Sequence, residues 1–548
     1  TNGHNVTFYV GGATLVNGGI LILSTIAGSV NATFVGNTTI SNGSMIFKES
    51  TGSGIVNFNS PFLMSGGTLF MHNDTSVSND IVTMNIKNNF THNGGVISFS
   101  TCTKPGGATN VLNLSGSAVA LGPAGNITRA LAGTGSVFGQ LNYSRIGNMS
   151  FTRVNGHDIQ QAKQSVASGT RLNCNSNIQI ASSSIAGTDY MAVNSSGILN
   201  LNGNQIFSNN LAANSGISIL SAGRIRTSHV NGLFNNTNFA AISNAGNMNY
   251  FLDPLSYVEI AGTTTKILTG IGLGLATGTQ HKYGILEINH TGAANTTFVY
   301  PTGSPSVSSV FIRTQLILLN GELNLVNSAT PVANGGRTIT IENNAATAIS
   351  RVNGYIKSEV QDFSGKVVWQ IGSGSGVYTI PFGYDNANYI PMSLNILTPP
   401  IGNATVATYH TPPTNLPWPP SVNNLFSGGG LSPDNRDATL DRYWNVSYSG
   451  SGVANMTMRF LTTEMPIPPY DVISELRAHR YNTLSNLWEA YIYGQIAGTG
   501  FITVPTIPSP GIWSASSIQS PLPVELISFT ASKKENDVLL KWITASEK

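Results

Sequence analysis

The segment Gly18-Gly19-Ile20-Leu21-Ile22-Leu23 joins two glycines to a run of apolar residues, and the same pattern returns three times before residue 100. It returns as Gly43-Ser44-Met45-Ile46-Phe47, Gly66-Gly67-Thr68-Leu69-Phe70-Met71 and Gly94-Gly95-Val96-Ile97-Ser98-Phe99. The first glycines of these segments are 25, 23 and 28 residues apart. Related segments follow at Gly197, Gly216 and Gly321. A period of this length indicates a repeated unit that buries its apolar side chains by stacking on its neighbours.

The unit that this repeat indicates is one coil of a parallel β-solenoid, with two or three short strands and tight corners. Strands stacked on both sides require inward-pointing apolar residues of high β-propensity. The corners require residues that tolerate positive φ, and the chain contains 59 Gly and 59 Asn. Equivalent side chains of successive coils lie about 4.8 Å apart, where Asn, Ser and Thr form hydrogen-bonded ladders but like charges repel. We therefore predict an all-β chain with a β-solenoid at residues 1–345, and an array of β-sandwiches is the alternative.

The charge of the chain is low and evenly balanced. The 548 residues include 26 Lys+Arg and 24 Asp+Glu, so only 9% are charged and the formal net charge is +2. A nucleic-acid-binding protein needs a clustered basic face to neutralise phosphates, so we expect no nucleic-acid partner. An apolar stretch such as residues 267–275 is broken by glycine and is far shorter than the roughly 20 residues of a bilayer helix. We therefore expect no membrane span.

A change in composition near residue 345 predicts a domain boundary. All six tryptophans, from Trp369 to Trp542, lie beyond it, and charged residues and prolines become more frequent there. The segment Val367-Val368-Trp369-Gln370-Ile371 alternates apolar residues with others, which is typical of antiparallel strands with one buried face. Proline-rich segments such as Pro417-Trp418-Pro419-Pro420 are expected in loops, because proline cannot occupy a central strand. We predict a β-sandwich region at residues 346–520.

Residues 521–548 carry a more specific motif. The sequence Pro521-Leu522-Pro523-Val524-Glu525-Leu526 opens an apolar segment, a charged turn follows at residues 533–537, and a second apolar segment begins at Val538. This pattern resembles the first strands of an immunoglobulin-like module near the C-terminus of many Bacteroidetes surface proteins of the type IX secretion system. Residues 378–383, 441–444 and 511–513 are also similar to those proteins. The resemblance implies an extracellular protein at the cell surface, with an incomplete Ig-like tail at residues 521–548.

The two apolar segments of this tail are a candidate assembly strand. A hairpin alone in water is marginally stable at best. It would expose the apolar side chains of Val524, Leu526, Phe529, Leu540 and Trp542. These side chains are covered by the preceding sandwich, by the remainder of the Ig-like module, or by a neighbouring subunit through strand addition. The third alternative predicts a homo-oligomer or homopolymer.

The chain contains no motif that indicates catalysis. It lacks a Gly-x-Ser-x-Gly elbow, a His-Glu-x-x-His motif and a P-loop, so we expect neither enzymatic activity nor a cofactor. A polysaccharide lyase or hydrolase is the enzymatic alternative, because glycosidic cleavage usually needs two carboxylates. One candidate is the pair Asp74 and Asp80, and a separate candidate is the compact basic cluster of Arg224, Arg226 and His229. We favour Asx turns for the aspartates and a solvated face for the arginines.

Residues that could bind a metal are sparse. Cys102 and Cys174 are too few for a zinc site and form either a candidate disulfide or two buried thiols. Oxygen ligands for Ca²⁺ are available at Asp434, Asn435, Asp437 and Asp441. Their spacing differs from that of an EF-hand loop, and a polar loop before a strand explains them as well. We predict no bound metal.

Taken as a whole, the sequence favours a structural role. A nearly neutral β-solenoid without a catalytic motif, in a chain that resembles exported surface proteins, suits a subunit of an extracellular filament, sheath or coat. Such a subunit would assemble through its end faces and its C-terminal strands. The alternative is a monomeric adhesin that binds surface glycans through the solenoid face or through Trp418, because aromatic rings stack on sugar rings.

Overall fold

The structure is a computed structural model of the 548-residue chain. It describes residues 4–74, 79–100, 109–128, 139–159, 162–180, 188–207, 215–234, 241–242, 249–268, 282–291, 296–299, 309–326, 337–425, 435–507, 510–518, 526–534 and 537–544. The chain divides into two compact units, Thr1–Gly262 with Leu268–Ile285 and Thr263–Ile267 with Leu286–Lys548. Among the residues that the structure describes, no helix has the length and apolar character that crossing a bilayer demands.

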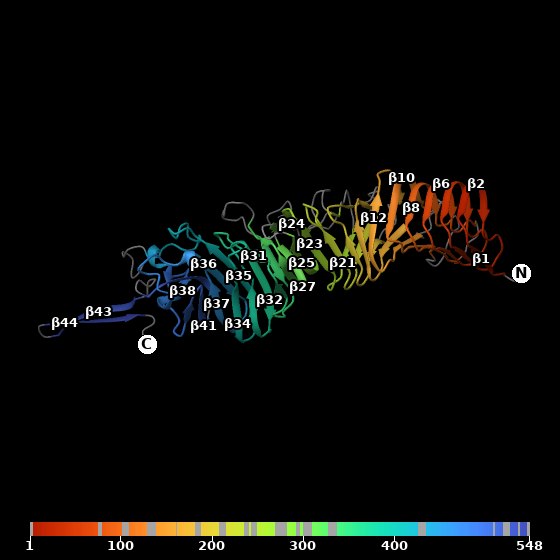
Figure 1. The fold of residues 1–548 in the computed structure, drawn as a ribbon. Helices are drawn as coiled ribbons and strands as arrows, with labels where there is room; N and C mark the ends of the chain where they lie inside the picture. Colours follow the sequence, from red (N-terminus) through yellow and green to blue (C-terminus); the bar gives the residue numbers. More distant parts are fainter. Residues whose placement is uncertain are drawn as a thin grey trace. The chain divides into compact units, whose positions relative to one another are not determined.

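The first unit consists of parallel strands in two principal sheets (Figure 1). One sheet has ten strands, which are β1 (Val6–Val10), β3 (Val30–Phe34), β5 (Gly54–Phe58), β7 (Val82–Ile86), β9 (Val111–Leu114), β11 (Gly139–Tyr143), β14 (Ala162–Val166), β17 (Thr188–Val193), β20 (Ser215–Ile219) and β22 (Asn249–Leu252). We call it the ten-stranded sheet.

The strands of the second face alternate with those of the ten-stranded sheet along the chain. They are β2 (Thr14–Ile22), β4 (Thr38–Ile46), β6 (Phe62–Phe70), β8 (Phe90–Ser98), β10 (Ala118–Thr128), β12 (Gly147–Arg153), β13 (Asp158–Ile159), β15 (Thr170–Cys174), β18 (Ile198–Asn200), β21 (Arg224–Thr227) and β23 (Tyr257–Gly262). A separate pair is formed by β16 (Ile178–Gln179) and β19 (Ile206–Phe207).

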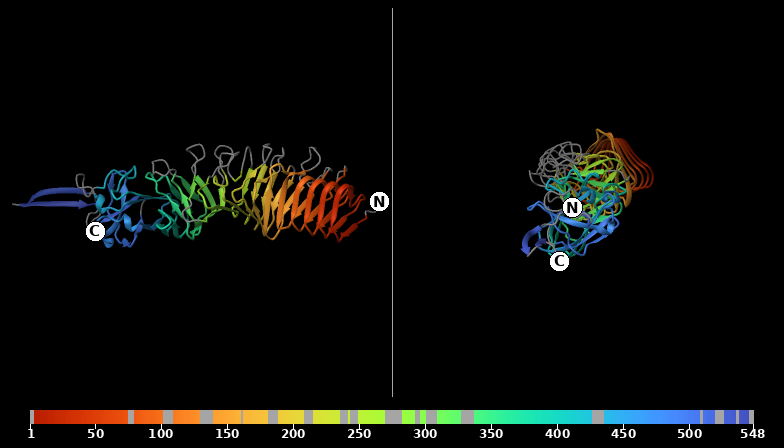
Figure 2. Two further views of the ribbon diagram at one scale, coloured as in Figure 1. Left: turned by 45° about the horizontal axis from the view of Figure 1, so that its top comes forward. Right: turned by 90° about the vertical axis from the view of Figure 1, so that its left-hand side faces the viewer.

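Successive strands pair in parallel with a regular offset. In the ten-stranded sheet Val6 lies opposite Val30, Val30 opposite Gly54, and Gly54 opposite Val82, which are steps of 24, 24 and 28 residues. The left-hand view of Figure 2 shows these strands side by side in the red and orange part of the chain. The structure is a parallel β-solenoid of about ten turns. The prediction of a solenoid is confirmed, and the alternative of a sandwich array is wrong for this unit.

The glycines of the repeat lie inside long strands, whereas the sequence predicted glycine at the corners between strands. β2, β4, β6 and β8 have nine residues each, with the glycines near the middle. Gly43, Gly67 and Gly95 have φ angles of +78°, +72° and +85°, and a Cβ atom at Gly67 would lie 2.5 Å from the carbonyl oxygen of Gly43 in the preceding coil. Only glycine fits both this dihedral angle and this space. The repeat therefore marks a kink within each strand.

Apolar rows fill the interior of the solenoid. In β5, Val56 and Phe58 are buried, whereas Ile55 and Asn57 lie on the outer face. The rings of Phe34 and Phe58 stack with centroids 4.9 Å apart and an interplanar angle of 13°. This distance is close to the separation of neighbouring strands, so equivalent side chains of successive coils contact one another. Each such apolar side chain contributes about 1.5–3 kcal/mol when it is fully buried.

The second unit begins with further parallel strands. They are β26 (Thr296–Val299), β27 (Ser309–Asn320), β28 (Glu322–Asn324), β29 (Thr338–Ile341), β30 (Ile349–Arg351), β31 (Tyr355–Lys357) and β32 (Lys366–Gly372). β26, β28 and β31 pair in that order, and β27 pairs with β29 and β30. Two further strands, β24 (Lys266–Leu268) and β25 (Lys282–His290), contain residues of both units.

Strand pairing changes from parallel to antiparallel at β32, which pairs in parallel with β29 and antiparallel with β35. One antiparallel sheet continues through β35 (Gly402–His410), β36 (Arg442–Tyr448), β42 (Gly511–Ser517), β38 (Leu476–Asn482) and β39 (Leu487–Trp488). The other contains β33 (Gly376–Ile380), β34 (Met392–Thr398), β37 (Val453–Arg459), β41 (Phe501–Ile507) and β40 (Ile496–Gly498). The 3-10 segments of the described chain are η2 (Arg436–Ala438), η3 (Thr462–Glu464) and η4 (Ile473–Glu475).

Side chains of the two antiparallel sheets contact each other. Trp369 of β32 meets Tyr378 of β33 edge to face, with ring centroids 5.0 Å apart. The hydroxyl group of Tyr448 on β36 donates to the carbonyl oxygen of Ile507 on β41 at 2.9 Å. Val367, Trp369 and Ile371 are buried, as their alternation predicts. These contacts support the predicted sandwich.

Candidate functional site

The strands β43 (Leu526–Lys534) and β44 (Asp537–Thr544) form an antiparallel hairpin, which is labelled in the blue part of Figure 1. Phe529 lies opposite Trp542 and Ala531 lies opposite Leu540, so these four residues share one face of the hairpin. Among the residues that the structure describes, β43 and β44 pair only with each other. Each strand therefore has one edge at which its backbone N–H and C=O groups can receive a further strand.

Apolar side chains of this hairpin are exposed. Phe529 is 58% exposed and Leu540 is 48% exposed. Val524 lies outside the described residues, and the structure describes the strand positions of Leu526 and Trp542 but not their side chains. Of the five residues of the candidate assembly strand, Phe529 and Leu540 are thus placed on one exposed apolar face. The contribution of the other three remains a prediction.

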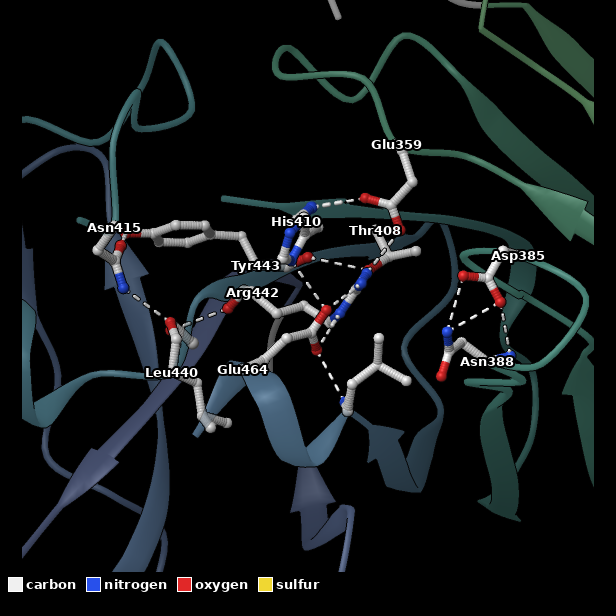
Figure 3. A network of polar contacts seen from close by, with 12 residues as sticks. Glu359, Asp385, Asn388, Thr408, His410, Asn415, Leu440, Arg442, Tyr443 and Glu464 are labelled. Atoms are coloured by element: carbon white, nitrogen blue, oxygen red, sulfur yellow. Dashed lines mark hydrogen bonds and ion pairs between the residues drawn. The ribbon is translucent and has the colours of Figure 1, made fainter. Parts of the chain in front are cut away.

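A second candidate site is a buried ion network beside the antiparallel sheets (Figure 3). The side chain of Arg442, the first residue of β36, is fully buried between the carboxylates of Glu359 and Glu464. Its Nη1 donates to Oε1 of Glu359 at 2.7 Å, and its Nε and Nη2 donate to the two oxygens of Glu464 at 2.8 and 2.5 Å. Such a bidentate pair is stronger and more directional than a hydrogen bond between neutral groups.

Neighbouring groups complete the network. Nη1 of Arg442 also donates to Oγ1 of Thr408 at 2.7 Å, and the backbone N–H of His410 donates to Oε2 of Glu359 at 2.6 Å. Nδ1 of His410 lies 2.9 Å from Oε1 of Glu464. All four carboxylate oxygens of the two glutamates thus have partners. Paired buried charges of this kind hold loops and strands in one arrangement.

The network shifts the pKa values of its acidic groups. Burial acts to raise the pKa of Glu464. The charge of Arg442 has the largest opposite effect, and together with hydrogen bonds from His410, Arg442 and the backbone of Leu461 it lowers this pKa to about 2. Burial raises the pKa of the adjacent Asp441 to about 7; His410 lowers it and the charge of Glu464 raises it. Perturbed pKa values arise in structural ion networks as well as in active sites. The complete pairing favours a structural role here.

The residues proposed as calcium ligands are dispersed. Asp441 is buried next to the ion network, Asp437 lies in η2, and the backbone carbonyl oxygen of Asn435 accepts hydrogen bonds from Ala438 and Thr439. Asp434 lies outside the described residues. Within the described ranges, no group of three His, Cys, Asp or Glu side chains could hold a metal ion.

The two carboxylates proposed for glycosidic cleavage lie near a buried lysine. Burial lowers the pKa of Lys48, and the charges of Asp80 and Asp74 act in the opposite direction. Oδ2 of Asp80 also accepts a hydrogen bond from the backbone N–H of Gly52 at 2.5 Å, across one coil. Both aspartates thus act on the charge of the same lysine, and the hypothesis that they form a catalytic pair stays a prediction. Their contacts nevertheless have a structural explanation, which is to compensate the buried ammonium group.

The basic cluster of the repeat region joins two coils. Arg224 and Arg226 of β21 pair with the buried carboxylate of Glu259 on β23, at 3.0 and 2.9 Å. The guanidinium of Arg224 also lies over the ring of Tyr257, 4.6 Å from its centroid. Both arginine side chains are about a quarter exposed on the outer side of β21, and both also pair with an acid 33 to 35 residues away, a pairing that the sequence did not predict. Nδ1 of His229 accepts a hydrogen bond from the backbone N–H of Asn231 at 3.2 Å.

Trp418, the proposed sugar-binding ring, is partly buried. It packs against an apolar cluster that includes Phe363, Tyr481 and Trp488. Its carbonyl oxygen accepts a hydrogen bond from Nε2 of Gln361 at 2.6 Å. The proline-rich loop thus covers one face of the antiparallel sheet, and part of the Trp418 ring is used in packing.

The two cysteines of the candidate disulfide differ in what the structure describes. Cys174, on β15, is fully buried, and burial raises the pKa of its thiol to about 12. Cys102 lies outside the described residues, so the disulfide remains a prediction. A thiol with such a pKa is a poor nucleophile at neutral pH, because the thiolate is the reactive form.

No protein-family model, curated protein or solved structure matches this chain. The fold defines its class, which is a parallel β-solenoid protein with an additional pair of antiparallel sheets.

Proposed function

We propose that this protein is a structural subunit of an extracellular filament, sheath or coat on a bacterial cell surface, and that the β43–β44 hairpin joins one subunit to the next. The observation that carries the proposal is the exposed apolar face of the hairpin, with Phe529 and Leu540. A contiguous apolar patch on unpaired strands is typical of a surface that binds another chain. Strand addition would cover the patch and complete the backbone hydrogen bonds at the hairpin edge.

The rest of the molecule suits a passive role. The stacked coils of the solenoid are held by parallel pairing and by buried apolar rows. The buried charges of Arg442, Glu359 and Glu464 are engaged with one another. We propose that the chain is not an enzyme. The extracellular location rests on the resemblance of residues 521–526 to type IX secretion proteins.

Strand addition between identical subunits predicts open polymers. The hairpin of one subunit would bind a different surface of the next subunit, which is a heterologous contact. Such contacts form an open polymer when the rotation that relates successive subunits does not close a ring. The hairpin tip carries Lys533, Lys534 and Asp537, which keep the edge soluble before assembly.

Point variants of the exposed face test this proposal. We expect Phe529→Ser combined with Leu540→Ser to remain monomeric in sedimentation velocity at a concentration at which the unchanged chain forms large species. A matched control is Leu484→Ser, because Leu484 is 96% exposed but lies in the turn between β38 and β39. Equal sedimentation of the double variant and the unchanged chain would contradict the proposal.

A further inference from the structure

A ladder of asparagine side chains runs along the outer face of the ten-stranded sheet. Nδ2 of Asn85 donates to Oδ1 of Asn57 at 3.0 Å, Asn113 donates to Asn85 at 2.8 Å, and Asn142 donates to Asn113 at 2.9 Å. These residues lie opposite one another in β5, β7, β9 and β11. The same amide is therefore presented once per coil, at a separation of about 4.8 Å.

The ladder leaves hydrogen-bonding capacity unused. An asparagine amide has two N–H donors and an oxygen with two acceptor sites. Within the ladder, Asn85 and Asn113 each use one donor and one acceptor site. No hydrogen bond to another described residue uses the second N–H of either amide, and both side chains are half-buried. Asn85 and Asn113 thus each offer one donor and one acceptor site to a ligand on the outer face, whereas the Asn142 oxygen already accepts hydrogen bonds from Gln140 and Ser165.

Aromatic side chains lie at both ends of this row. Tyr9 is in register with Thr33, which is in register with Asn57, and the Tyr9 side chain is 75% exposed. At the other end, beyond β11, the row finishes at Phe251 of β22, which is 51% exposed. Exposed aromatic rings offer an apolar face for stacking, and the phenol of Tyr9 adds a polar group.

The charge of the outer face restricts the class of ligand. Between its aromatic ends the row contains Thr33, Asn57, Asn85, Asn113, Asn142, Ser165, Ala192 and Ser218. Ser165 and Ser218 are buried, so the continuously accessible part of the row ends at Asn142. None of these side chains is charged. The neighbouring outer row contains Thr7, Asn31, Ile55, Thr83, Val111, Gln140 and Lys163. A charged polymer would therefore find one cation and no anion in these two rows, whereas a neutral hydroxylated polymer would find donors and acceptors at Asn85 and Asn113.

We propose that the asparagine ladder binds a neutral linear polysaccharide, with the sugar chain lying across the strands and parallel to the row. Hydroxyl groups of successive sugars exchange hydrogen bonds with successive amides, and a terminal sugar ring stacks on Tyr9. A repeating polymer suits a repeating surface, because each added coil adds the same contact. The inference is independent of the hairpin and of subunit assembly.

Binding to amorphous cellulose, a neutral β-linked glucan, tests the proposal in the full chain. We expect Asn85→Leu combined with Asn113→Leu to weaken binding about thirtyfold, because each of the two amides loses a hydrogen bond of roughly 1 kcal/mol. Leucine is tolerated at outer positions of these strands, since Ile55 and Val111 occupy the adjacent row. The matched control is Asn173→Leu, because Asn173 accepts a hydrogen bond from Asn200 at 2.9 Å in a two-rung ladder on the other sheet.

A second variant tests the aromatic end. We expect Tyr9→Ser to weaken binding by several-fold without changing the melting temperature, because Tyr9 is mostly exposed. Far-UV circular dichroism of every variant verifies the fold. Equal retention of the unchanged chain and the double variant on cellulose would overturn the proposal, as would no retention of the unchanged chain. Retention on anionic alginate that exceeds retention on cellulose would also overturn it.

Discussion

His92 and His157 contact each other inside the solenoid, although 65 residues separate them in the sequence. Nε2 of His157 lies 3.0 Å from Nδ1 of His92, and the two rings are nearly perpendicular with centroids 4.9 Å apart. Gly125 of β10 lies beside both rings, and a Cβ atom there would come within 2.8 Å of His157 and 3.1 Å of His92. The absence of a side chain at Gly125 thus makes room for a buried polar pair.

This histidine pair predicts that the solenoid loses stability in mild acid. Burial lowers the pKa of His92 to about 4, and burial together with the charges of His92 and Arg153 lowers the pKa of His157 to about 3. The unfolded chain binds protons at these residues below about pH 6.5, whereas the folded chain does not until about pH 4. The contribution of this pair to the free energy of unfolding is therefore constant above pH 6.5 and falls as the pH decreases from 6.5 towards 4.

The pH dependence of the melting temperature between pH 7.5 and 5 measures this effect. Asp441, with a pKa of about 7, and His479, with a pKa of about 4, also contribute to the pH dependence in this range, so comparison with a variant isolates the histidine pair. We expect His92→Gln combined with His157→Gln to give a flatter profile than the unchanged chain, whatever its absolute stability. The account of the histidine pair is wrong if both proteins show the same slope.

Replacement of Arg442 should strongly destabilise the second unit. Arg442→Met leaves the carboxylates of Glu359 and Glu464 buried without their cation, and breaking a buried pair from one side costs about 3–5 kcal/mol. Urea unfolding measured at neutral pH provides the free energy. The matched control is Arg480→Met, because Arg480 pairs with Glu489 at a position where the two side chains are 21% and 33% exposed. We expect that control to lose less than about 1 kcal/mol; similar losses in both variants would contradict the role of burial.

The stacked glycines allow a test of the kink. Gly67→Ala places a Cβ atom 2.5 Å from the carbonyl oxygen of Gly43, at a φ of +72°. Gly169 has a similar φ of +74°, and a Cβ atom there would have no neighbour within 4 Å, so Gly169→Ala measures the cost of the dihedral angle alone. That cost is about 1–2 kcal/mol, and the close contact in Gly67→Ala should add about 1–3 kcal/mol. Equal melting temperatures for the two variants would show that the coils separate to admit the methyl group.

The solenoid could be predicted from the sequence because its signal is local and repeated. The glycines and apolar runs recur at nearly the number of residues that separates paired positions in neighbouring strands. The low charge and the abundant asparagine correctly predicted polar ladders such as the one from Asn57 to Asn142. The position of the glycines within a strand was missed, because a turn and a positive-φ kink require the same residue.

The buried ion network could not be predicted from the sequence. Glu464 lies 22 residues from Arg442, and Glu359 lies 83 residues from it, so no short motif joins them. The pairing of Arg224 and Arg226 with Glu259 was missed for the same reason. The number of residues in a coil varies with the length of its loops. The sequence separation of two residues that pair across coils is therefore unknown until the strand register is known. The hairpin could be located by its two apolar segments on either side of a charged turn, and the structure places Phe529 and Leu540 on one face of it.

Negative-stain electron microscopy of the chain with and without residues 526–544 tests the central claim most directly. Both proteins should be imaged at the same micromolar concentration and after the same storage time. The account predicts ordered fibres or sheets from the full chain and dispersed single particles after removal of the β43–β44 hairpin. Dispersed particles from both proteins, or the same fibres from both, would contradict the role of the hairpin as the joint between structural subunits.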